Sequence, residues 1–326
     1  MNDTPARRAI RVGVLGCSDI ACRRFLPALR QSELAELVAI GSHDHYATNR
    51  RIGTSGSELL AYDTLLERND IDLIYLSLPN HLHEEWAIRA LRAGKHVLCE
   101  KPLGLDATAV QHMHDVAATE GLLLYENLMF LQHPQHAAVK RIAALGRLGR
   151  LRSLRATFTI PALPTDNFRN DPARGGGAFH DQIRYPLSAA IYFFSGEHYV
   201  FQGLKVYSGE LLTAMHGTGV TEKKEIFHFS IGFGLPYKSA YELIGEQGSV
   251  LVDRAFTTPA DLSNRITVTI DGRDESLTIP PADHFLLTID HVCNLLSTPE
   301  SFPQIRIRNE RLATLADELY RSCHAG

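Results

Sequence analysis

The stretch "IRVGVLGCSDIACRRFLPAL", residues 10–29, decides how the first half of this chain folds. It begins with a short apolar run, which is typical of a strand buried on both faces of a sheet, and Gly16 follows that run directly. From residue 20 onward the apolar positions recur about every 3.6 residues, which predicts a helix. A strand, a glycine turn and a helix in this order indicate the start of a βαβ unit.

The same alternation continues along the chain to about residue 126. Further apolar runs, each typical of a buried parallel strand, occupy residues 34–40, 72–78, 96–99 and 122–127. Between them, helical periodicity covers residues 82–93 and 106–119. Strands that alternate with helices form a parallel sheet covered on both faces. We therefore expect residues 1–126 to form an α/β domain with the doubly wound parallel sheet of a Rossmann fold.

The second half of the chain has a different pattern. Longer segments of alternating apolar and polar residues follow one another with few helices between them, at residues 151–160, 199–209, 224–234, 237–253 and 264–272. Successive strands without crossover helices predict an antiparallel sheet. Helical periodicity returns near the end, where Leu312, Leu315 and Leu319 share one side. We expect residues 127–326 to form an α+β domain with a large, mainly antiparallel sheet.

Composition limits the function. The chain has 326 residues and a formal net charge of -4, which argues against a surface for nucleic acid or an anionic membrane. Its five cysteines are odd in number and lack the spacing of a metal site or a disulfide framework. No apolar run approaches the ~20 residues that span a bilayer, and the first residues lack the apolar core of a signal peptide. We expect a cytoplasmic protein that binds no metal, nucleic acid or membrane.

The turn after the first strand has the spacing of a dinucleotide-binding fingerprint. If Gly16 is the first glycine, Ser18 stands at the second position and Ala21 at the third, where alanine is accepted. Unpaired N–H groups and the helix dipole favour an anion at such a turn, here the pyrophosphate of a dinucleotide. The residues expected to contact this cofactor are Gly16, Cys17, Ser18, Asp19 and Ile20. The alternative is a tight turn without a ligand.

The end of the second strand bears on which dinucleotide is bound. Sites for NAD usually place a carboxylate here, whereas sites for NADP offer small polar and cationic groups to the 2′-phosphate. In this chain Ser42 and His43 follow the strand, Asp44 comes late, and Arg50 and Arg51 lie in the next helix. We expect Ser42 and His43 to contact the cofactor, and NADP(H) to be preferred over NAD(H). The alternative for both arginines is a solvated position on the helix.

A histidine pair follows the strand of residues 72–78. His81 and His83 are two residues apart and so do not share a face of a helix, which argues against a metal site. Asn80 is of the residue type that caps helix N-termini, and we expect it to cap the helix that follows.

The next strand ends in a candidate catalytic residue. The sequence "HVLCEKPLGLD", residues 96–106, places Glu100, Lys101 and Pro102 where a parallel strand opens into its loop, the position from which α/β enzymes usually act. The longer stretch "LPNHLHEEWAIRALRAGKHVLCEKPL", residues 78–103, resembles the segment shared by the Gfo/Idh/MocA oxidoreductases. That resemblance implies a lysine beside the nicotinamide and the substrate, which is Lys101 here. It also implies cofactor contacts at Leu78, Pro79, Asn80, His83, Glu100, Lys101 and Pro102.

A glycine triplet in the second half precedes another pair of candidates. Gly175–Gly177 permit positive φ angles or a close approach of the backbone, and a helix is predicted directly after them. Asp181 and Tyr185 are four residues apart and would share one face of that helix. Together an acid and a phenol can orient a hydroxylated ligand and supply a proton. The alternative is an aspartate that offsets the helix dipole and a tyrosine in the core.

This segment also resembles the Gfo/Idh/MocA family, whose second signature is a glycine triplet, an aspartate and, four residues later, a histidine or tyrosine. Tyr185 followed by Pro186 matches the branch of sugar 3-ketoreductases from antibiotic deoxysugar pathways, and "ENLMFLQHPQH" and "SAYELIGEQGSVLVD" agree with it. The chain departs from the family at Ile183, where glycine is common, and Arg184 adds volume beside Tyr185.

The resemblance implies that NADPH reduces the C-3 ketone of a dTDP-linked keto-deoxysugar. The nicotinamide would deliver hydride to the carbonyl carbon while Tyr185 or Lys101 protonates the oxygen and the other holds it; we favour Tyr185 as the acid. The resemblance also implies a homodimer or homotetramer that assembles through the sheet of the second domain. Two alternatives stay open: an NAD(P)-dependent dehydrogenase of a free sugar or polyol, and a cofactor-binding pseudoenzyme without redox activity.

Overall fold

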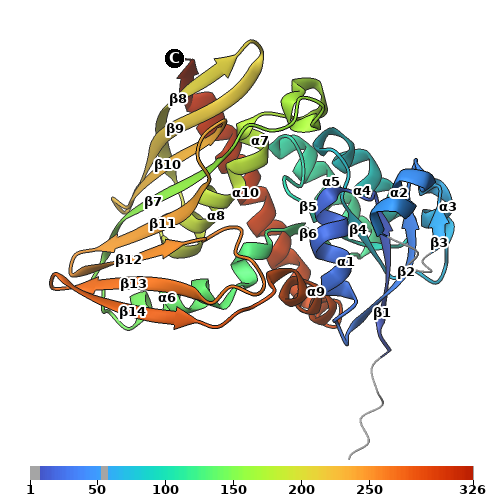
Figure 1. Cartoon of the computed structure of the whole chain (residues 1–326), viewed down its shortest axis with the longest axis horizontal. Helices are drawn as coiled ribbons and strands as arrows, with labels where there is room; N and C mark the ends of the chain where they lie inside the picture. Colours follow the sequence, from blue (N-terminus) through green and yellow to red (C-terminus); the bar gives the residue numbers. More distant parts are fainter. Residues whose placement is uncertain (1–7, 53–57, 326) are drawn as a thin grey trace, which may run out of the picture. The chain divides into compact units, whose positions relative to one another are not determined.

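The computed structural model describes residues 8–52 and 58–325 (Figure 1). By its internal contacts the chain divides into two compact units. The first comprises residues up to 103, residues 108–127 and residues 285–309, and the second comprises residues 104–107, 128–284 and those from 310 onward. Residues 285–309 thus group with the first unit, although the sequence pattern assigned them to the second domain. Periodicity identifies a helix but does not say which sheet the helix packs on.

The first unit is built on a parallel six-stranded sheet. Its strand order is β3-β2-β1-β4-β5-β6, and every neighbouring pair is parallel. This is the strand order of the Rossmann fold, as the sequence predicted. The strands are β1 (Ile10–Leu15), β2 (Ala35–Gly41), β3 (Glu58–Leu60), β4 (Leu73–Leu76), β5 (His96–Glu100) and β6 (Leu124–Asn127).

Helices connect these strands, as the crossovers of a parallel sheet require. The helix predicted from residue 20 forms as a π-helical turn that continues into a short α-helix. The connecting helical segments are η1 (Ala21–Phe25), α1 (Leu26–Leu29), α2 (His45–Ile52), α3 (Tyr62–Glu67), η2 (Asn80–Leu82), α4 (His83–Arg92) and α5 (Ala107–Glu120), and most of the later helix α9 (His284–Leu295) also groups with this unit. Within the described residues, no helix is both long enough and apolar enough to cross a bilayer.

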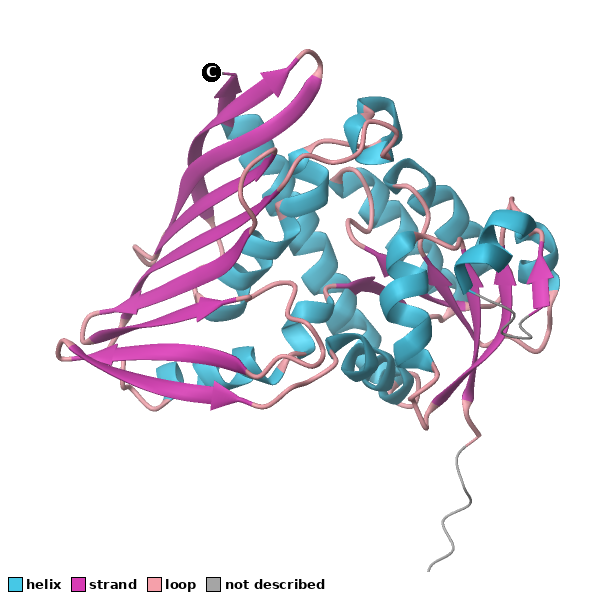
Figure 2. Ribbon diagram, in the orientation of Figure 1, coloured by secondary structure: helices cyan, strands magenta, loops and turns pink. Residues whose placement is uncertain are grey.

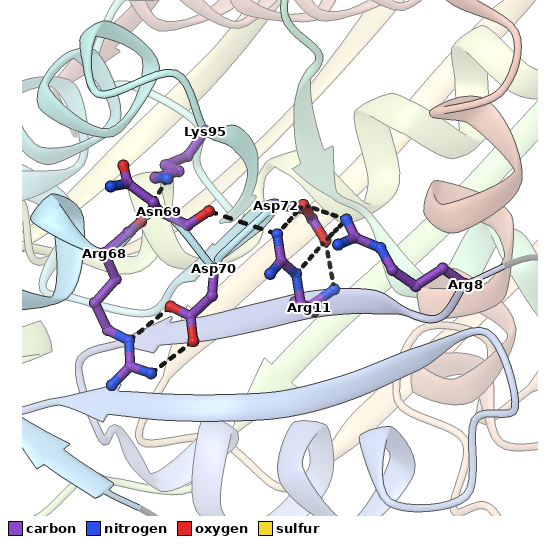
Figure 3. A network of polar contacts seen from close by, with 7 residues as sticks. All are labelled: Arg8, Arg11, Arg68, Asn69, Asp70, Asp72 and Lys95. Carbon is purple, nitrogen blue, oxygen red and sulfur yellow. Dashed lines mark hydrogen bonds and ion pairs between the residues drawn. The ribbon is translucent and has the colours of Figure 1, made fainter.

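A network of charged side chains joins the amino ends of β1 and β4 (Figure 3). The carboxylate of Asp72 accepts hydrogen bonds from the backbone N–H of Arg11 at 2.9 Å and from Nη2 of Arg8 and of Arg11, each at 3.0 Å. On the same side of the sheet, Nζ of Lys95 donates to the carbonyl of Arg68 at 2.6 Å. These contacts hold the start of β1 in place. They lie at the amino ends of the strands, whereas the candidate site lies at the carboxyl ends.

The second unit is built on a nine-stranded sheet of order β14-β13-β12-β11-β7-β10-β9-β8-β15. Its pairs are antiparallel except for β7 with β10 and β8 with β15, so the prediction of a mainly antiparallel sheet is confirmed. The strands are β7 (Leu151–Ile160), β8 (Tyr199–Ser208), β9 (Leu211–Thr221), β10 (Ile226–Phe233), β11 (Lys238–Gly245), β12 (Gly248–Asp253), β13 (Asn264–Ile270), β14 (Arg273–Ile279) and β15 (Cys323–Ala325).

Figure 2 shows helices along one side of this sheet. They include α7 (Ala178–Gln182), which packs against β9 and β10, and α8 (Arg184–Phe193), which packs against β7. The other helical segments of this unit are η3 (Met129–Gln132), α6 (Pro134–Ala144), η4 (Phe168–Asn170), η5 (Pro172–Arg174) and much of α10 (Phe302–Ser322), and η6 (Pro299–Ser301) precedes α10. Leu154 and Phe158 of β7 are buried, whereas Val200 of β8 is 73% exposed. The sheet therefore has one covered face and one open face.

Candidate active site

The turn after β1 has the tight geometry that a dinucleotide-binding turn requires. Gly16 has a φ of 92°, and a Cβ on it would lie 2.6 Å from Cδ2 of Leu78 and 3.0 Å from the carbonyl oxygen of Ser77. The N–H of Gly16 donates to the carbonyl of Gly41 at 3.1 Å, and Oγ of Ser77 donates to the carbonyl of Gly16 at 2.8 Å. Only glycine fits here, and the turn is held against the ends of β2 and β4.

The side chains after Gly16 leave the backbone of the turn as its binding surface. Oγ of Ser18 accepts a hydrogen bond from the N–H of Ala21 at 3.2 Å, and Asp19 forms an exposed ion pair with Arg23 at 3.3 Å. Ile20 precedes η1. Because the first N–H groups of a helix have no partner within it, this turn fits a pyrophosphate.

Two cysteine thiols meet at the same turn. Sγ of Cys17 and Sγ of Cys22 are 2.9 Å apart, and both cysteines are free thiols. The hydrogen bond from Cys17 lowers the pKa of Cys22 to about 7, and it raises the pKa of Cys17 well above its usual range. The sequence indicated no pairing among the cysteines, but a spacing of five residues across the turn brings these two together. Among the described residues, no cluster of side chains is suited to a metal ion.

The predicted ribose-phosphate residues lie at the end of β2. Ser42 is buried, and its Oγ hydrogen-bonds with Oγ1 of Thr48 at 2.7 Å. His43 is exposed, and its ring centroid lies 4.0 Å from that of Tyr62. Nη1 of Arg51 donates to the carbonyl of Cys17 at 3.2 Å, which places a cation beside the first turn. The side chain of Arg50 lies outside the described residues.

The loop after β4 differs from expectation. Asn80 begins the 3-10 turn η2, and α4 begins at His83 with Leu82 at its N-cap position, so the prediction that Asn80 caps this helix is wrong. His83 is fully buried, with Nδ1 2.7 Å from the carbonyl oxygen of Pro102 and Nε2 2.9 Å from that of Leu78. Burial lowers the pKa of His83. The ring thus joins the loops after β4 and β5, and its contact with a cofactor stays a prediction.

The candidate lysine directly follows β5, whose last residue is held by buried hydrogen bonds. Glu100 is buried, and its Oε1 accepts hydrogen bonds from Oη of Tyr75 and Nδ2 of Asn127, each at 2.6 Å. Burial raises the pKa of Glu100 above its usual range, although both hydrogen bonds oppose the rise. The peptide bond between Lys101 and Pro102 is cis, and Lys101 is half-buried. Glu100 therefore supports the loop from inside the sheet.

In the second unit, the glycine triplet folds a loop back onto α7. Gly175 and Gly177 have φ angles of 73° and 97°, and a Cβ on Gly176 would lie 2.5 Å from the carbonyl oxygen of Arg169. This close approach brings Nε of Arg169 within 2.8 Å of Oδ1 of Asp181. The carboxylate of Asp181 thus has a cationic partner that the sequence did not predict.

Tyr185 lies in an aromatic cluster of the second unit. Its side chain is 4% exposed, and its ring centroid is 4.8 Å from that of Phe158, 5.6 Å from that of Phe130 and 5.7 Å from that of Phe256. Asp181 ends up in α7 and Tyr185 in α8, with Ile183 between the two segments in a helical conformation, so the single predicted helix is divided.

The two residues that depart from the family pattern are buried in the same unit. Ile183 is 1% exposed and Arg184 3% exposed. Nη2 of Arg184 donates to the carbonyl of Gly104 at 3.3 Å. Both side chains are therefore buried where α7 meets α8.

Several residues that hold these groups were not predicted from the sequence. Glu126 and Asn127 end the last parallel strand, and their place at its carboxyl end is a signal that could have drawn attention to them. Arg169 had no such signal, because it reaches Asp181 only through the fold of the glycine triplet.

Comparison with known proteins places these features in context. Residues 10–128 match a family model described as an oxidoreductase family with an NAD-binding Rossmann fold, and residues 136–251 match the Gfo/Idh/MocA C-terminal domain. A dTDP-3,4-didehydro-2,6-dideoxy-alpha-D-glucose 3-reductase of Actinomadura kijaniata is 38% identical over 86% of this chain and 85% of its own length. A protein of the same name from Saccharopolyspora spinosa is also 38% identical, over 85% of this chain and 84% of its own length.

A solved structure agrees along nearly the whole chain. It is that of a 3-ketoreductase from Actinomadura kijaniata in complex with NADP and TDP-benzene. It is 35% identical, matches with a TM-score of 0.92, and covers 98% of this chain and 99% of its own.

Proposed function

The chain belongs to the Gfo/Idh/MocA oxidoreductase family, and we propose that it is a sugar 3-ketoreductase, which reduces the C-3 ketone of a dTDP-linked keto-deoxysugar with NADPH. The observation that carries the proposal is the 38% identity to a dTDP-sugar 3-reductase over 86% of this chain. Because that identity runs through both the cofactor and the substrate domain, it supports the reaction and not only the fold.

NADPH is the cofactor in this proposal, and the residues present fit it. At Gly16 a Cβ would meet Leu78 at 2.6 Å, so the turn keeps the open backbone that a pyrophosphate needs. Ser42 and His43 follow β2, Arg51 lies beside the first turn, and in this proposal these small polar and cationic groups contact the 2′-phosphate of NADPH. When bound, NADPH supplies the hydride that reduces the carbonyl carbon.

The chain's own residues supply the proton and hold the substrate oxygen. Tyr185 donates its phenolic proton to the oxygen of the ketone as hydride arrives at the carbon, and the ammonium of Lys101 stabilises the negative charge on that oxygen. The aromatic rings around Tyr185 keep water from its ring. Asp181, held by Arg169, orients a sugar hydroxyl.

Assembly into a homodimer or homotetramer is part of the proposal. Val200, Val220 and Ile226 are paired in register across β8, β9 and β10, so they share the open face of the sheet, where they are 73%, 40% and 37% exposed. A second copy would cover this apolar row. Light scattering should give a dimer or tetramer, and Val200→Glu should weaken it. A monomer at micromolar concentration would remove this part of the proposal.

The cellular role in the proposal is cytoplasmic synthesis of deoxysugars for antibiotics. The resemblance of the Tyr185 segment to sugar 3-ketoreductases from antibiotic deoxysugar pathways supports this role, and the chemistry is tested first. The substrate to use is a freshly generated dTDP-3,4-diketo-2,6-dideoxyhexose, with loss of NADPH absorbance as the signal. Rapid loss that prefers NADPH over NADH, with a product reduced at C-3, supports the proposal. NADPH binding without oxidation would favour a pseudoenzyme, and reduction of NADP by a free sugar would favour a dehydrogenase.

A further inference from the structure

A buried histidine joins two loops at the carboxyl ends of neighbouring strands. His83 is the first residue of α4 and is 0% exposed. Its Nδ1 lies 2.7 Å from the carbonyl oxygen of Pro102, after β5, and its Nε2 lies 2.9 Å from the carbonyl oxygen of Leu78, after β4. Both partners are backbone carbonyls, which only accept, so a neutral ring donates to one of them; we assign the hydrogen bond to the shorter contact, from Nδ1 to Pro102.

A buried carboxylate acts on the same peptide group from its other end. Glu126 in β6 is 1% exposed, and its Oε1 accepts a hydrogen bond of 3.0 Å from the N–H of Leu103. The carbonyl of Pro102 and the N–H of Leu103 belong to one peptide bond. His83 therefore holds the oxygen end of this peptide group, and Glu126 holds its nitrogen end.

Two contacts at opposite ends of one peptide plane fix its rotation. Buried backbone groups need partners, and here two side chains provide them beyond the end of β5. A hydrogen bond to a carboxylate is about twice as strong as one between neutral groups, so the contact to Glu126 is a firm one. The proline ring also fixes the φ of Pro102. The chain directly after Lys101 thus has little conformational freedom.

We propose that His83 and Glu126 are positioning residues for Lys101: by holding the peptide group between Pro102 and Leu103 from both ends, they fix the direction in which the Lys101 side chain leaves its loop. This inference rests on the proposed function for the role of Lys101, but the holding of the loop does not depend on it.

Paired variants separate the contacts. In His83→Asn the amide nitrogen takes the place of Nδ1 and can still donate to Pro102, whereas in His83→Gln it takes the place of Nε2 and reaches Leu78 instead. Glu126→Gln keeps an oxygen that can accept from Leu103, and Glu126→Leu removes it. We expect kcat to fall ~10- to 100-fold in His83→Gln and Glu126→Leu, and to fall less in His83→Asn and Glu126→Gln.

A double-mutant cycle distinguishes positioning from a general loss of structure. In a Lys101→Ala background, His83→Gln and Glu126→Leu should cause no further loss of kcat, because their effect passes through the missing ammonium. A full, multiplicative loss in that background would overturn the proposal. Unfolding midpoints of all variants, measured in parallel, show whether each one is folded.

Two further readouts do not need turnover. The Leu103 amide should exchange its hydrogen ~10-fold faster in His83→Gln and Glu126→Leu, and at the wild-type rate in His83→Asn and Glu126→Gln. The rate at which an amine-selective acylating reagent labels Lys101 should change in the same two variants, with Lys140 as the unaffected reference. Unchanged exchange and labelling in all variants would refute the proposal. If the variants show these effects but the wild-type protein reduces no keto-sugar, only the proposed function is refuted.

Discussion

Nε of Arg169 donates a hydrogen bond of 2.8 Å to Oδ1 of Asp181, and the two side chains are 32% and 10% exposed. The pair links a loop to α7 through the approach that Gly176 permits. Removing the charge of a mostly buried partner leaves the other charge poorly solvated. Asp181→Asn should therefore lower the free energy of unfolding by ~1 to 3 kcal/mol and also lower kcat/KM.

Chemical denaturation and steady-state kinetics together check this prediction. Asp166→Asn, at an exposed position nearby in the sequence, is the matched control and should change neither quantity. Combining Asp181→Asn with Arg169→Gln should cost less than the sum of the single changes. Strictly additive costs would mean that the ion pair contributes little.

Tyr185→Phe should remove the proton donor and leave the packing in place. The ring contacts with Phe130, Phe158 and Phe256 do not need the hydroxyl, so the variant should stay folded. Turnover should fall roughly 10² to 10⁴-fold, the usual scale for a positioned acid. Tyr192→Phe, in the same helix, is the control. Wild-type turnover in both Tyr185→Phe and Lys101→Ala would show that other groups carry the proton.

Arg51→Ala should change the choice of cofactor. The guanidinium lies beside the turn that holds Gly16, through its contact with the carbonyl of Cys17 at 3.2 Å, and it can meet a 2′-phosphate from there. KM for NADPH should rise ~10-fold, equivalent to ~1.4 kcal/mol, and KM for NADH should stay the same. Steady-state kinetics with both cofactors measure this, with the exposed Arg92→Ala as control. An equal rise for both cofactors would mean that Arg51 supports the turn and does not read the phosphate.

Sequence patterns predicted the fold well where burial is uniform. The strand β4 is buried at every residue, and such a run in alternation with helices indicates a parallel sheet. The patterns did not predict that residues 285–309 group with the first unit, because a helical repeat is compatible with packing on either sheet. Gly16 was predictable from its place directly after the first strand, and in the structure its positive φ and crowded surroundings permit only glycine there.

The candidate site was predictable only where its chemistry lies in a short motif. Lys101 and Tyr185 belong to such motifs. Arg169 does not, because it reaches Asp181 over a turn whose course depends on tertiary contacts. Glu126 and His83 act on backbone groups after β5, and hydrogen bonds of that kind leave no spacing rule in the sequence.

Acid should destabilise the protein through two buried histidines. Burial lowers the pKa of His133 to about 4 and that of His136 to about 3, while the unfolded chain keeps values near ~6.5. Below pH ~6.5 the unfolded state binds protons that the native state does not. The contribution of these two histidines to stability is therefore fully present above that pH and is lost as the pH falls toward ~4. Each group contributes up to ~1.4 kcal/mol per pH unit in that window.

Urea denaturation between pH 7.5 and 5 tests this prediction. His133 accepts a hydrogen bond from the N–H of Gln135 at the start of α6, and an asparagine oxygen can replace it there. His133→Asn should therefore keep the cap and show a shallower loss of stability with acid, whereas the exposed His198→Asn should keep the wild-type slope. Identical slopes in all three proteins would assign the acid sensitivity to other groups.

Cys22 should be the most reactive of the cysteines, because the thiol of Cys17, 2.9 Å away, donates to it and lowers its pKa to about 7. The thiolate is the nucleophile, so the rate of alkylation by iodoacetamide should rise with pH around a midpoint near 7. Cys17→Ala removes the donor and should move that midpoint upward, and Cys17→Ser should give an intermediate value.

Cys323, whose pKa is raised by burial, is the slow internal reference. Mass spectrometry of the labelled peptides gives each rate, and NADPH should protect Cys22 because the turn that holds both cysteines is the proposed pyrophosphate site. A midpoint that does not move in Cys17→Ala would show that the contact between the thiols does not control this cysteine.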